Sequence, residues 1–465
     1  MAEASTSQIP ETELAIQRCI EAECGEGFPL HQQIYVCPTC GGLLEIIVPP
    51  PKSGTASDLR EVWQARLASK DARDRSGVWR FRELLPFAND APLVTLAEGN
   101  TPLYDAPHSA RYCGLDELKV KHLGLNPTGS FKDTGMTTAV TQALILGVRT
   151  LVCASTGNTA ASLATYAARA GLRCAILVPR GQVSLAKLAQ TLDYGATVLE
   201  VEGNFDDAMR VIRELSEDRS IYLVNSINPF RLEGQKTVAA ELLSQCDWQA
   251  PDHVIVPGGN LGNSSALGKG FAELFALGFI EQLPRLSVVQ AEGAAPFAHL
   301  FADHKQESPE SFARDALTAV KHPQTLASAI KIGAPVSWQK SARAVQDTDG
   351  WVLSVSEQEI ADAKAMIGRD GIGCEPASAT TVAGIKKMVS DGRIRSDESV
   401  VAVLTGHLLK DTEYVIRYHQ ENLFTNNRAP HLSKEERRIH GNFSNSPIRV
   451  AASRSAILRH LEDDK

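Results

Sequence analysis

The 465-residue sequence lacks an apolar run long enough to cross a membrane, and it lacks an excess of basic residues. A spanning helix needs roughly 18 consecutive apolar residues. The first residues, MAEASTSQIPETELAIQ, contain neither the basic nor the apolar part of a secretory signal. The formal net charge is −8 and there is no long basic block, which argues against an extended nucleic-acid interface. These absences predict a soluble cytoplasmic protein that acts on a small molecule, with no nucleic-acid or membrane partner.

The sequence also lacks a disulfide framework, because its nine cysteines are an odd number and most stand alone. Isolated cysteines inside apolar segments are typical of free thiols in a reducing compartment. The scattered ones are Cys113, Cys153, Cys174, Cys246 and Cys374.

The four remaining cysteines lie close together near the N-terminus. Cys19 and Cys24 form a C-x4-C pair, and Cys37 and Cys40 form a C-x2-C pair. Four thiolates can close a tetrahedral zinc site and hold a ribbon that is too small to fold by burial alone. The wider first pair leaves open a ribbon that has lost its metal and keeps its cysteines as small apolar residues. We expect a zinc-ribbon-like element at 17–48 and a Pro- and Gly-containing linker at 49–76.

The rest of the chain alternates apolar strands with amphipathic helices. The segments LVCAS, CAILV, ATVLEVE and IYLVNS are separated by helices through Tyr166, Leu192 and Leu215. Further strands are expected at HVIVP, LSVVQAE and VVAVLTG. This order is typical of an α/β fold with parallel sheets covered on both faces. We predict a catalytic core at 77–424, with a smaller lobe at about 113–228 and a larger lobe in the remainder. A C-terminal extension at 425–465 is expected to close with a strand at SPIRV and a helix at SAILRHL.

One lysine, Lys132, follows the loop NPTGSF and begins an apolar helix through Met136, Val140 and Leu144. Pro127 and Gly129 favour a turn there, and Ser130 can cap the helix. The helix dipole disfavours an ammonium in the first turn, and burial would lower the lysine pKa further. The resulting amine is suited to a Schiff base with pyridoxal phosphate. Taken alone, the motif also fits a solvated lysine at a helix start.

A glycine-rich turn, PGGNLGN at 257–263, follows the strand HVIV and precedes a helix. Its amides can converge on a phosphate at the helix N-terminus. The turn lacks the Walker lysine and the dinucleotide spacing, so a single phosphate fits better than ATP or NAD. Thr405, at the end of VVAVL, can hydrogen-bond a pyridine nitrogen or is an ordinary strand-end residue. We interpret the neighbouring His407 as structural.

Two further segments place polar groups at strand ends. The segment STGNTAAS at 155–162 offers an anion site, and its Asn158 can donate to a ring hydroxyl; an ordinary helix cap is the alternative. The segment NSINPFRLEGQKT at 225–237 has an arginine and several amides, which suit a charged substrate or belong to a surface loop. Glu375, in CEPAS, is a candidate to position the lysine or a water.

Six motifs, NPTGSFKDTG, STGNTAAS, NPFRLEGQKT, GGNLGN, EPASA and TGH, occur in this order and resemble those of the threonine synthases. These are fold-type II pyridoxal-phosphate enzymes. The resemblance covers roughly residues 17–424, including the cysteine ribbon and the segment APLVTLAEGNTPL. It implies a tryptophan synthase β-like fold with two three-layer αβα lobes and parallel-rich sheets. The implied cofactor is pyridoxal 5'-phosphate, and the ribbon adds structural zinc as an expectation.

The resemblance also implies a role for each motif. Lys132 carries the Schiff base, Asn158 meets the ring hydroxyl and Thr405 faces the pyridine nitrogen. The implied contacts of the cofactor phosphate are Gly258, Gly259, Asn260, Leu261, Gly262 and Asn263. The implied contacts of the substrate are Ser155, Thr156, Thr159, Asn225, Ser226 and Arg231. The expected metal ligands are Cys19, Cys24, Cys37 and Cys40.

The implied reaction converts O-phospho-L-homoserine and water to L-threonine and phosphate, and this fold type commonly forms homodimers. Phosphate leaves from Cγ and water adds at Cβ. Alternatives are a threonine dehydratase, a cysteate synthase, or a non-catalytic binding protein on a degenerate scaffold. Arg231 disfavours a dehydratase, because the substrate of a dehydratase carries no phosphate. A cysteate synthase also takes a phosphorylated substrate and stays open.

Overall fold

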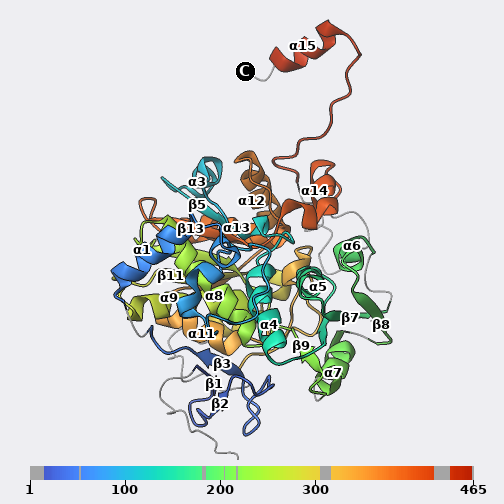
Figure 1. Ribbon diagram of the computed structural model, residues 1–465. Helices are drawn as coiled ribbons and strands as arrows, with labels where there is room; N and C mark the ends of the chain where they lie inside the picture. The colour runs from blue at the N-terminus through green and yellow to red at the C-terminus, as the bar shows by residue number, and fades with distance from the viewer. Residues whose placement is uncertain are drawn as a thin grey trace, which may run out of the picture. The chain divides into compact units, whose positions relative to one another are not determined.

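The computed structural model describes residues 15–51, 54–180, 185–203, 205–215, 218–303, 316–423 and 440–462. The chain divides into two compact units, Met1–Lys410 and Asp411–Lys465. In the described part of the first unit, the strands form sheets of three, six and four strands (Figure 1). The predicted α/β class is confirmed. No helix in the described part of the chain combines the length and apolar character needed to cross a bilayer.

The six-stranded sheet has the order β12-β11-β10-β13-β5-β4 and is parallel except for β4, which pairs antiparallel with β5. Its strands are β4 (Leu103–Asp105), β5 (Lys119–His122), β10 (His253–Pro257), β11 (Arg285–Ala291), β12 (Val352–Val355) and β13 (Val400–Leu404). Every residue of β10 and β13 is buried, as expected for central strands covered on both faces. The strands predicted at HVIVP, LSVVQAE and VVAVLTG are confirmed.

Helices cover both faces of this sheet, and alternate residues of each strand separate the two layers. On β10, Val254 and Val256 belong to one apolar core and Ile255 belongs to the other. The first core is completed by α8 (Phe230–Gln245), α9 (Gly262–Ala276) and α11 (Trp338–Asp347). The second is completed by α3 (Pro107–Cys113), α12 (Glu357–Arg369) and α13 (Pro376–Ser390).

The four-stranded sheet, ordered β8-β7-β6-β9, is parallel throughout. Its strands are β6 (Thr150–Ala154), β7 (Arg173–Pro179), β8 (Thr197–Val201) and β9 (Ile221–Leu223). Leu151 and Cys153 pack in a core with α4 (Lys132–Ile145) and α5 (Asn158–Ala170), while Val152 and Ala154 face α7 (Phe205–Leu215). With α6 (Leu185–Asp193), these helices confirm the helices predicted through Tyr166, Leu192 and Leu215.

The N-terminal ribbon is a small antiparallel sheet of β1 (Ile16–Cys19), β2 (Gly27–Pro29) and β3 (Leu44–Ile47), with β1 in the centre. Side chains from both larger sheets' helices hold it. Gln142 of α4 donates to Leu30 O at 2.9 Å, and Lys340 of α11 donates to Leu44 O at 2.5 Å. The ribbon is therefore anchored to both halves of the core.

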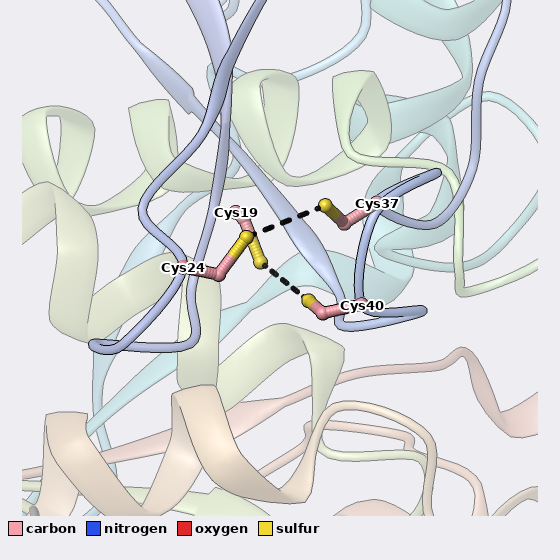
Figure 2. Close-up of side chains that lie close together, drawn as sticks. All are labelled: Cys19, Cys24, Cys37 and Cys40. Carbon is pink, nitrogen blue, oxygen red and sulfur yellow. Dashed lines mark hydrogen bonds between the residues drawn. The ribbon is translucent and has the colours of Figure 1, made fainter.

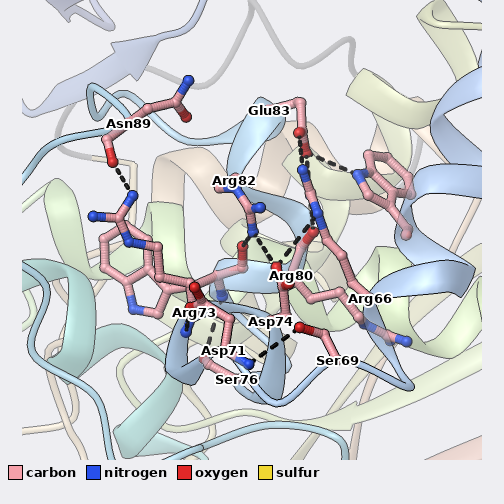
Figure 3. A network of polar contacts seen from close by, with 12 residues as sticks. Arg66, Ser69, Asp71, Arg73, Asp74, Ser76, Arg80, Arg82, Glu83 and Asn89 are labelled. Carbon is pink, nitrogen blue, oxygen red and sulfur yellow. Dashed lines mark hydrogen bonds and ion pairs between the residues drawn. The ribbon is translucent and has the colours of Figure 1, made fainter.

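The expected linker at 49–76 is only partly a linker, because α1 (Ala56–Arg66) folds within it. Leu59 and Trp63 lie one helical turn apart and form a buried apolar stripe. The prediction of a linker rested on the Pro and Gly content of the segment and missed this spacing. The Trp63 ring stacks on Phe279 at a centroid distance of 4.8 Å. Arg66 donates to Glu83 at 2.8 Å (Figure 3). The indole Nε1 of Trp63 donates to the same carboxylate at 2.9 Å. Packing and charge pairing thus fix the segment.

The second unit contains α14 (Thr412–His419) and α15 (Arg454–Glu462) in its described part. The helix predicted at SAILRHL is confirmed, but the strand predicted at SPIRV is wrong, because residues 446–450 have no regular structure. Pro447 removes one amide donor, and the described residues of this unit offer no strand to pair with. Of the polar stretch 425–440, which the sequence places at the start of the C-terminal extension, residues 425–439 lie outside the described residues.

The remaining short elements connect the larger ones. They are α2 (Ala72–Arg75), η1 (Trp79–Leu84), η2 (Leu123–Leu125), η3 (Glu292–Ala294), α10 (Pro296–Asp303), η5 (Ser328–Ile330) and η6 (Leu408–Lys410).

Candidate active site

The carboxyl end of β13 brings two distant loops together. Phe131 N donates to Thr405 O at 2.9 Å, and His407 N donates to Gly129 O at 2.9 Å. On the other side, the amide of Glu375 donates to Gly406 O at 3.0 Å. These backbone contacts place the lysine loop and the start of α13 at the end of a central parallel strand, where ligands of open α/β sheets bind.

Lys132 is the first residue of α4, as predicted, but Ser130 does not cap this helix. Ser130 pairs through its backbone with Gly406, and its buried hydroxyl has no partner. The loop is closed instead by Asp133, whose carboxylate accepts from Thr128 N and Thr128 Oγ1, both at 2.7 Å. The backbone pairing with β13 therefore takes precedence over the local capping preference of serine.

The Lys132 amine has an unusual electrostatic environment. Burial, together with the positive charge of Arg231, lowers the Lys132 pKa to about 7, against a weaker opposing effect of Glu375. Arg231 is 2% exposed, and burial lowers its pKa to about 10. Its Nη1 donates to Val224 O at 3.2 Å, whereas its buried Nε has no partner.

Among the described residues, neither Lys132 nor Arg231 forms an ion pair. A buried cation such as Arg231 is costly without a counter-charge, and a protonated Lys132 nearby adds repulsion to that cost. This part of the core therefore favours an anionic ligand.

A buried carboxylate connects two of the predicted cofactor contacts. Glu375 Oε2 accepts from Asn158 Nδ2 at 2.9 Å, and Glu375 Oε1 lies 3.2 Å from Thr405 Oγ1. Burial raises the Glu375 pKa, although the hydrogen bonds from Asn158 and Thr405 act in the opposite direction. Ser378 Oγ lies 3.2 Å from Thr405 Oγ1 and completes the cluster.

The glycine-rich turn joins β10 to α9, as predicted. Gly258 touches its neighbours so closely that a Cβ there would lie 2.7 Å from both Gln290 Cγ and Val288 Cγ1. Further along the turn, Leu261 has a left-handed backbone with φ 64°, which is strained for a bulky residue. Asn263 is buried, and in the part of the chain that the structure describes neither its amide nitrogen nor its amide oxygen has a hydrogen-bond partner. A turn of this kind, with unused donors, fits a phosphate group.

The residues predicted to hold substrate lie on neighbouring loops. Asn225 exchanges two 3.0 Å hydrogen bonds with the backbone of Ala154, at the end of β6. Ser226 Oγ accepts from Asn260 Nδ2 at 3.0 Å, which joins this loop to the glycine-rich turn. Ser155, Thr156 and Thr159 are half-buried where α5 begins. The contacts of these residues with substrate stay predictions.

The residues present fit pyridoxal phosphate. The pKa of the lysine amine is about 7, the buried Asn263 amide of the glycine-rich turn has no hydrogen-bond partner among the described residues, and oxygen atoms of Glu375 and Ser378 surround Thr405. Two contributors had no role assigned from the sequence, Asp133 and Ser378. Ser378 lies three residues after Glu375, so both side chains come from the first turn of α13, and this spacing was the available signal.

The four ribbon cysteines converge, as predicted (Figure 2). All four sulfur atoms lie within 4.8 Å of one another. The sulfur atoms of Cys19 and Cys40 lie 3.4 Å apart, and those of Cys24 and Cys37 lie 3.7 Å apart. Sulfurs at the corners of a tetrahedron with 2.3 Å zinc bonds lie about 3.8 Å apart. The donor set and spacing fit zinc.

Comparison with known proteins agrees with this site. The family model described as "Pyridoxal-phosphate dependent enzyme" matches residues 94–406. The threonine synthase of Methanocaldococcus jannaschii is 46% identical over 87% of this chain and 95% of that protein. The threonine synthase of Methanosarcina acetivorans is 44% identical over 87% of this chain and 94% of that protein.

A solved structure extends the comparison to the fold. The processed form of threonine deaminase isoform 2 from Solanum lycopersicum superposes with a TM-score of 0.56, at 19% identity. It covers 81% of this chain and 92% of that chain, which shows a shared fold.

Proposed function

We propose the reaction from the family, because the chain belongs to the threonine synthases of the pyridoxal-phosphate-dependent enzyme family. The reaction converts O-phospho-L-homoserine and water to L-threonine and phosphate. The enzyme class, a lyase that uses pyridoxal phosphate, follows from this family. The named relatives favour this activity over the threonine dehydratase, cysteate synthase and non-catalytic alternatives.

The observation that supports the phosphorylated substrate best is the buried guanidinium of Arg231, which has no ion-pair partner among the described residues and lies near the half-buried Lys132. One anionic group, the cofactor phosphate, has a separate place at the glycine-rich turn. A second anion is then needed near Arg231. A substrate phosphate supplies this charge, and the guanidinium can bind it through more than one N–H group.

Pyridoxal phosphate, when bound, supplies an aldehyde for amines and a ring that withdraws electrons from bonds near the substrate nitrogen. The Lys132 amine holds the cofactor and, being neutral above pH about 7, accepts the proton of the substrate Cα. Asn158 and Thr405 orient the ring, and residues 258–263 bind its phosphate. The start of α5, with Ser155, binds the substrate carboxylate.

Arg231 stays charged at neutral pH, because its pKa of about 10 lies well above 7. In this role the guanidinium binds the phosphate of the substrate and then stabilises it as a leaving group at Cγ. Lys132 returns a proton to the substrate carbon after water has added at Cβ. Arg231 acts from a buried position and Lys132 from a half-buried one, which strengthens their electrostatic effect.

The direct test mixes purified protein, loaded with pyridoxal phosphate, with O-phospho-L-homoserine. Phosphate and threonine should appear in equal amounts. Ammonia and a keto acid in place of threonine would refute the synthase reaction and favour a dehydratase. Homoserine with phosphate would indicate simple hydrolysis instead.

For the ribbon we propose a structural zinc ion held by Cys19, Cys24, Cys37 and Cys40. Elemental analysis of the purified protein should give one zinc per chain, and the double variant C37S/C40S should lose it. Zinc that survives in the double variant would place the metal elsewhere. The homodimer and the cytoplasmic location remain predictions from the sequence.

A further inference from the structure

Thr405 is expected to face the ring nitrogen of the cofactor, and two neighbours decide what its hydroxyl offers. We propose that Ser378 and Glu375 orient the Thr405 hydroxyl, so that Thr405 donates to the ring nitrogen while Glu375 holds the proton that the ring would otherwise carry. This inference rests on the proposed placement of the ring beside Thr405. Ser378 and Glu375 act through Thr405 and are positioning residues.

The argument begins with Ser378, whose hydroxyl oxygen is fully engaged as an acceptor. It accepts from Thr405 N at 2.9 Å and from Gly406 N at 3.1 Å. A hydroxyl has two lone pairs and one proton, so Ser378 can only donate to a further partner. Thr405 Oγ1, at 3.2 Å, is that partner. Ser378 therefore occupies one of the two lone pairs of Thr405.

The Thr405 hydroxyl then has one proton and one lone pair left for two further hydrogen-bond partners. One side is Glu375 Oε1 at 3.2 Å, and the other is the ring nitrogen. An ionised Glu375 accepts the Thr405 proton, which leaves only a lone pair for the ring and requires a protonated nitrogen. A protonated Glu375 donates to Thr405, and Thr405 donates to an unprotonated nitrogen. The two arrangements hold the same number of protons and differ by shifting two of them along the chain.

The surroundings of Glu375 favour the protonated form. The carboxyl group is 4% exposed and packs directly on Gly406, where a Cβ would lie 2.2 Å from Glu375 Cδ. Burial raises its pKa, while Asn158, Thr405, Lys132 and Lys410 act in the opposite direction without cancelling that effect. Its second oxygen accepts from Asn158 Nδ2, so the proton is left on the side of Thr405.

The consequence concerns the chemistry of the ring. An unprotonated pyridine withdraws electrons less strongly than a pyridinium. Glu375 would thus moderate the cofactor without touching it. A protonated Glu375 donates one hydrogen bond to Thr405 and accepts one from Asn158. A glutamine in one orientation can make the same two bonds, because its oxygen accepts from Asn158 and its amide nitrogen donates to Thr405.

The first experiment is infrared difference spectroscopy of wild-type protein minus Glu375→Gln. We expect a carboxylic acid C=O band that is lost in the variant, both with and without the cofactor. Loss of carboxylate bands instead would overturn the proposal. The matched control is Glu357→Gln, which removes another buried carboxyl group with a raised pKa on α12. The difference spectrum of this control identifies the C=O band of Glu357, so that this band is not mistaken for the band of Glu375.

The second experiment follows the ring nitrogen by NMR in holoenzyme loaded with ¹⁵N-labelled pyridoxal phosphate. At neutral pH, wild-type and Glu375→Gln enzymes should both show an unprotonated nitrogen. As the pH rises, the wild-type resonance should shift in one step that Glu375→Gln lacks, while Glu357→Gln should follow the wild type. Steps that come from Lys132 or Lys410 persist in all three proteins, although they shift in Glu375→Gln, where the two lysines lose the effect of the Glu375 charge.

A protonated nitrogen in the wild type at neutral pH would overturn the proposal, and so would identical pH profiles for wild type and Glu375→Gln. A purely structural Glu375 gives such identical profiles. If the wild-type protein binds no cofactor, the proposed function fails, and the infrared band of the cofactor-free protein still decides the state of Glu375.

Discussion

Two buried cations of α8, Arg231 and Lys236, lie about one and a half turns apart and have opposite surroundings. Arg231, like the amine of Lys132 on α4, has no ion-pair partner among the described residues. At Lys236, the ammonium lies 2.6 Å from Glu233 Oε2 and 2.7 Å from Glu273 Oε2. Lys269 also contacts Glu233, so two lysines face two glutamates.

The contrast separates a structural network from a binding site. Burial opposes the charge of Lys236, but Glu233 and Glu273 outweigh it and raise the Lys236 pKa. Burial also opposes the charge of Lys132, and there Arg231 adds to it, so the pKa falls to about 7. A compensated cation stabilises the fold, whereas an uncompensated one is available for a ligand and for proton transfer.

Among the variants that test this contrast, substitution of Lys132 should have the largest effect, and the effect is on turnover. Lys132→Met removes the amine that holds the cofactor and moves protons. Turnover should fall by at least about 10²–10⁴-fold, as for loss of a positioned acid–base group. The measurements are phosphate release and the visible absorbance of the bound cofactor. Retention of both in the variant would move the catalytic lysine elsewhere.

Substitution of Lys236 should affect stability instead. Lys236→Met leaves Glu233 with one cation fewer in a fully buried place, and should lower the free energy of unfolding by about 3–5 kcal/mol. Urea titration measures the loss. The double variant Lys236→Met with Glu273→Gln is the control and should recover part of it, because it restores charge balance. A loss below about 1 kcal/mol would show that the network contributes little.

Arg231→Met tests the same helix on its uncompensated side. Loss of a charge-assisted contact with the substrate phosphate should lower kcat/KM by roughly 30-fold, equivalent to about 2 kcal/mol. Cofactor absorbance should be kept. The free energy of unfolding, measured without ligands, should not fall as it does in Lys236→Met, because no ion pair is broken. A variant that cannot retain the cofactor would disprove the assignment of Arg231 to the substrate.

The pH dependence of stability should show the smallest difference. The folded pKa of Lys132, about 7, lies below its ordinary value of 10.5, so the unfolded chain binds more protons between these two pH values. The stability of cofactor-free wild type should therefore rise with pH from about 7 to 10.5 relative to Lys132→Met. We expect about 1–2 kcal/mol, because water screens part of the penalty at this partly exposed side chain. Parallel curves for the two proteins would contradict the lowered pKa.

Much of the fold could be read from local patterns. The strands ending near Ala154, Pro257 and Leu404 were recognisable because buried parallel strands are short, continuous apolar runs. Where tertiary contacts compete with local preference, prediction failed. Ser130 pairs with Gly406 instead of capping α4, and Trp63 folds a supposed linker onto Phe279. The SPIRV segment has strand-forming residues but no partner strand.

The sequence by itself determined which chemical groups stand at strand ends and helix starts, because turn residues, glycines and apolar periodicity act over a few residues. It therefore supplied Lys132, the glycine-rich turn and Thr405. Only the tertiary structure decided which charges meet. Arg231 and Lys236 belong to one short motif, yet among the described residues Arg231 has no carboxylate partner, whereas Lys236 is held by two carboxylates. Electrostatic energy depends on the distance between charges and on their burial in the folded protein. The spacing of residues along the chain determines neither of these quantities.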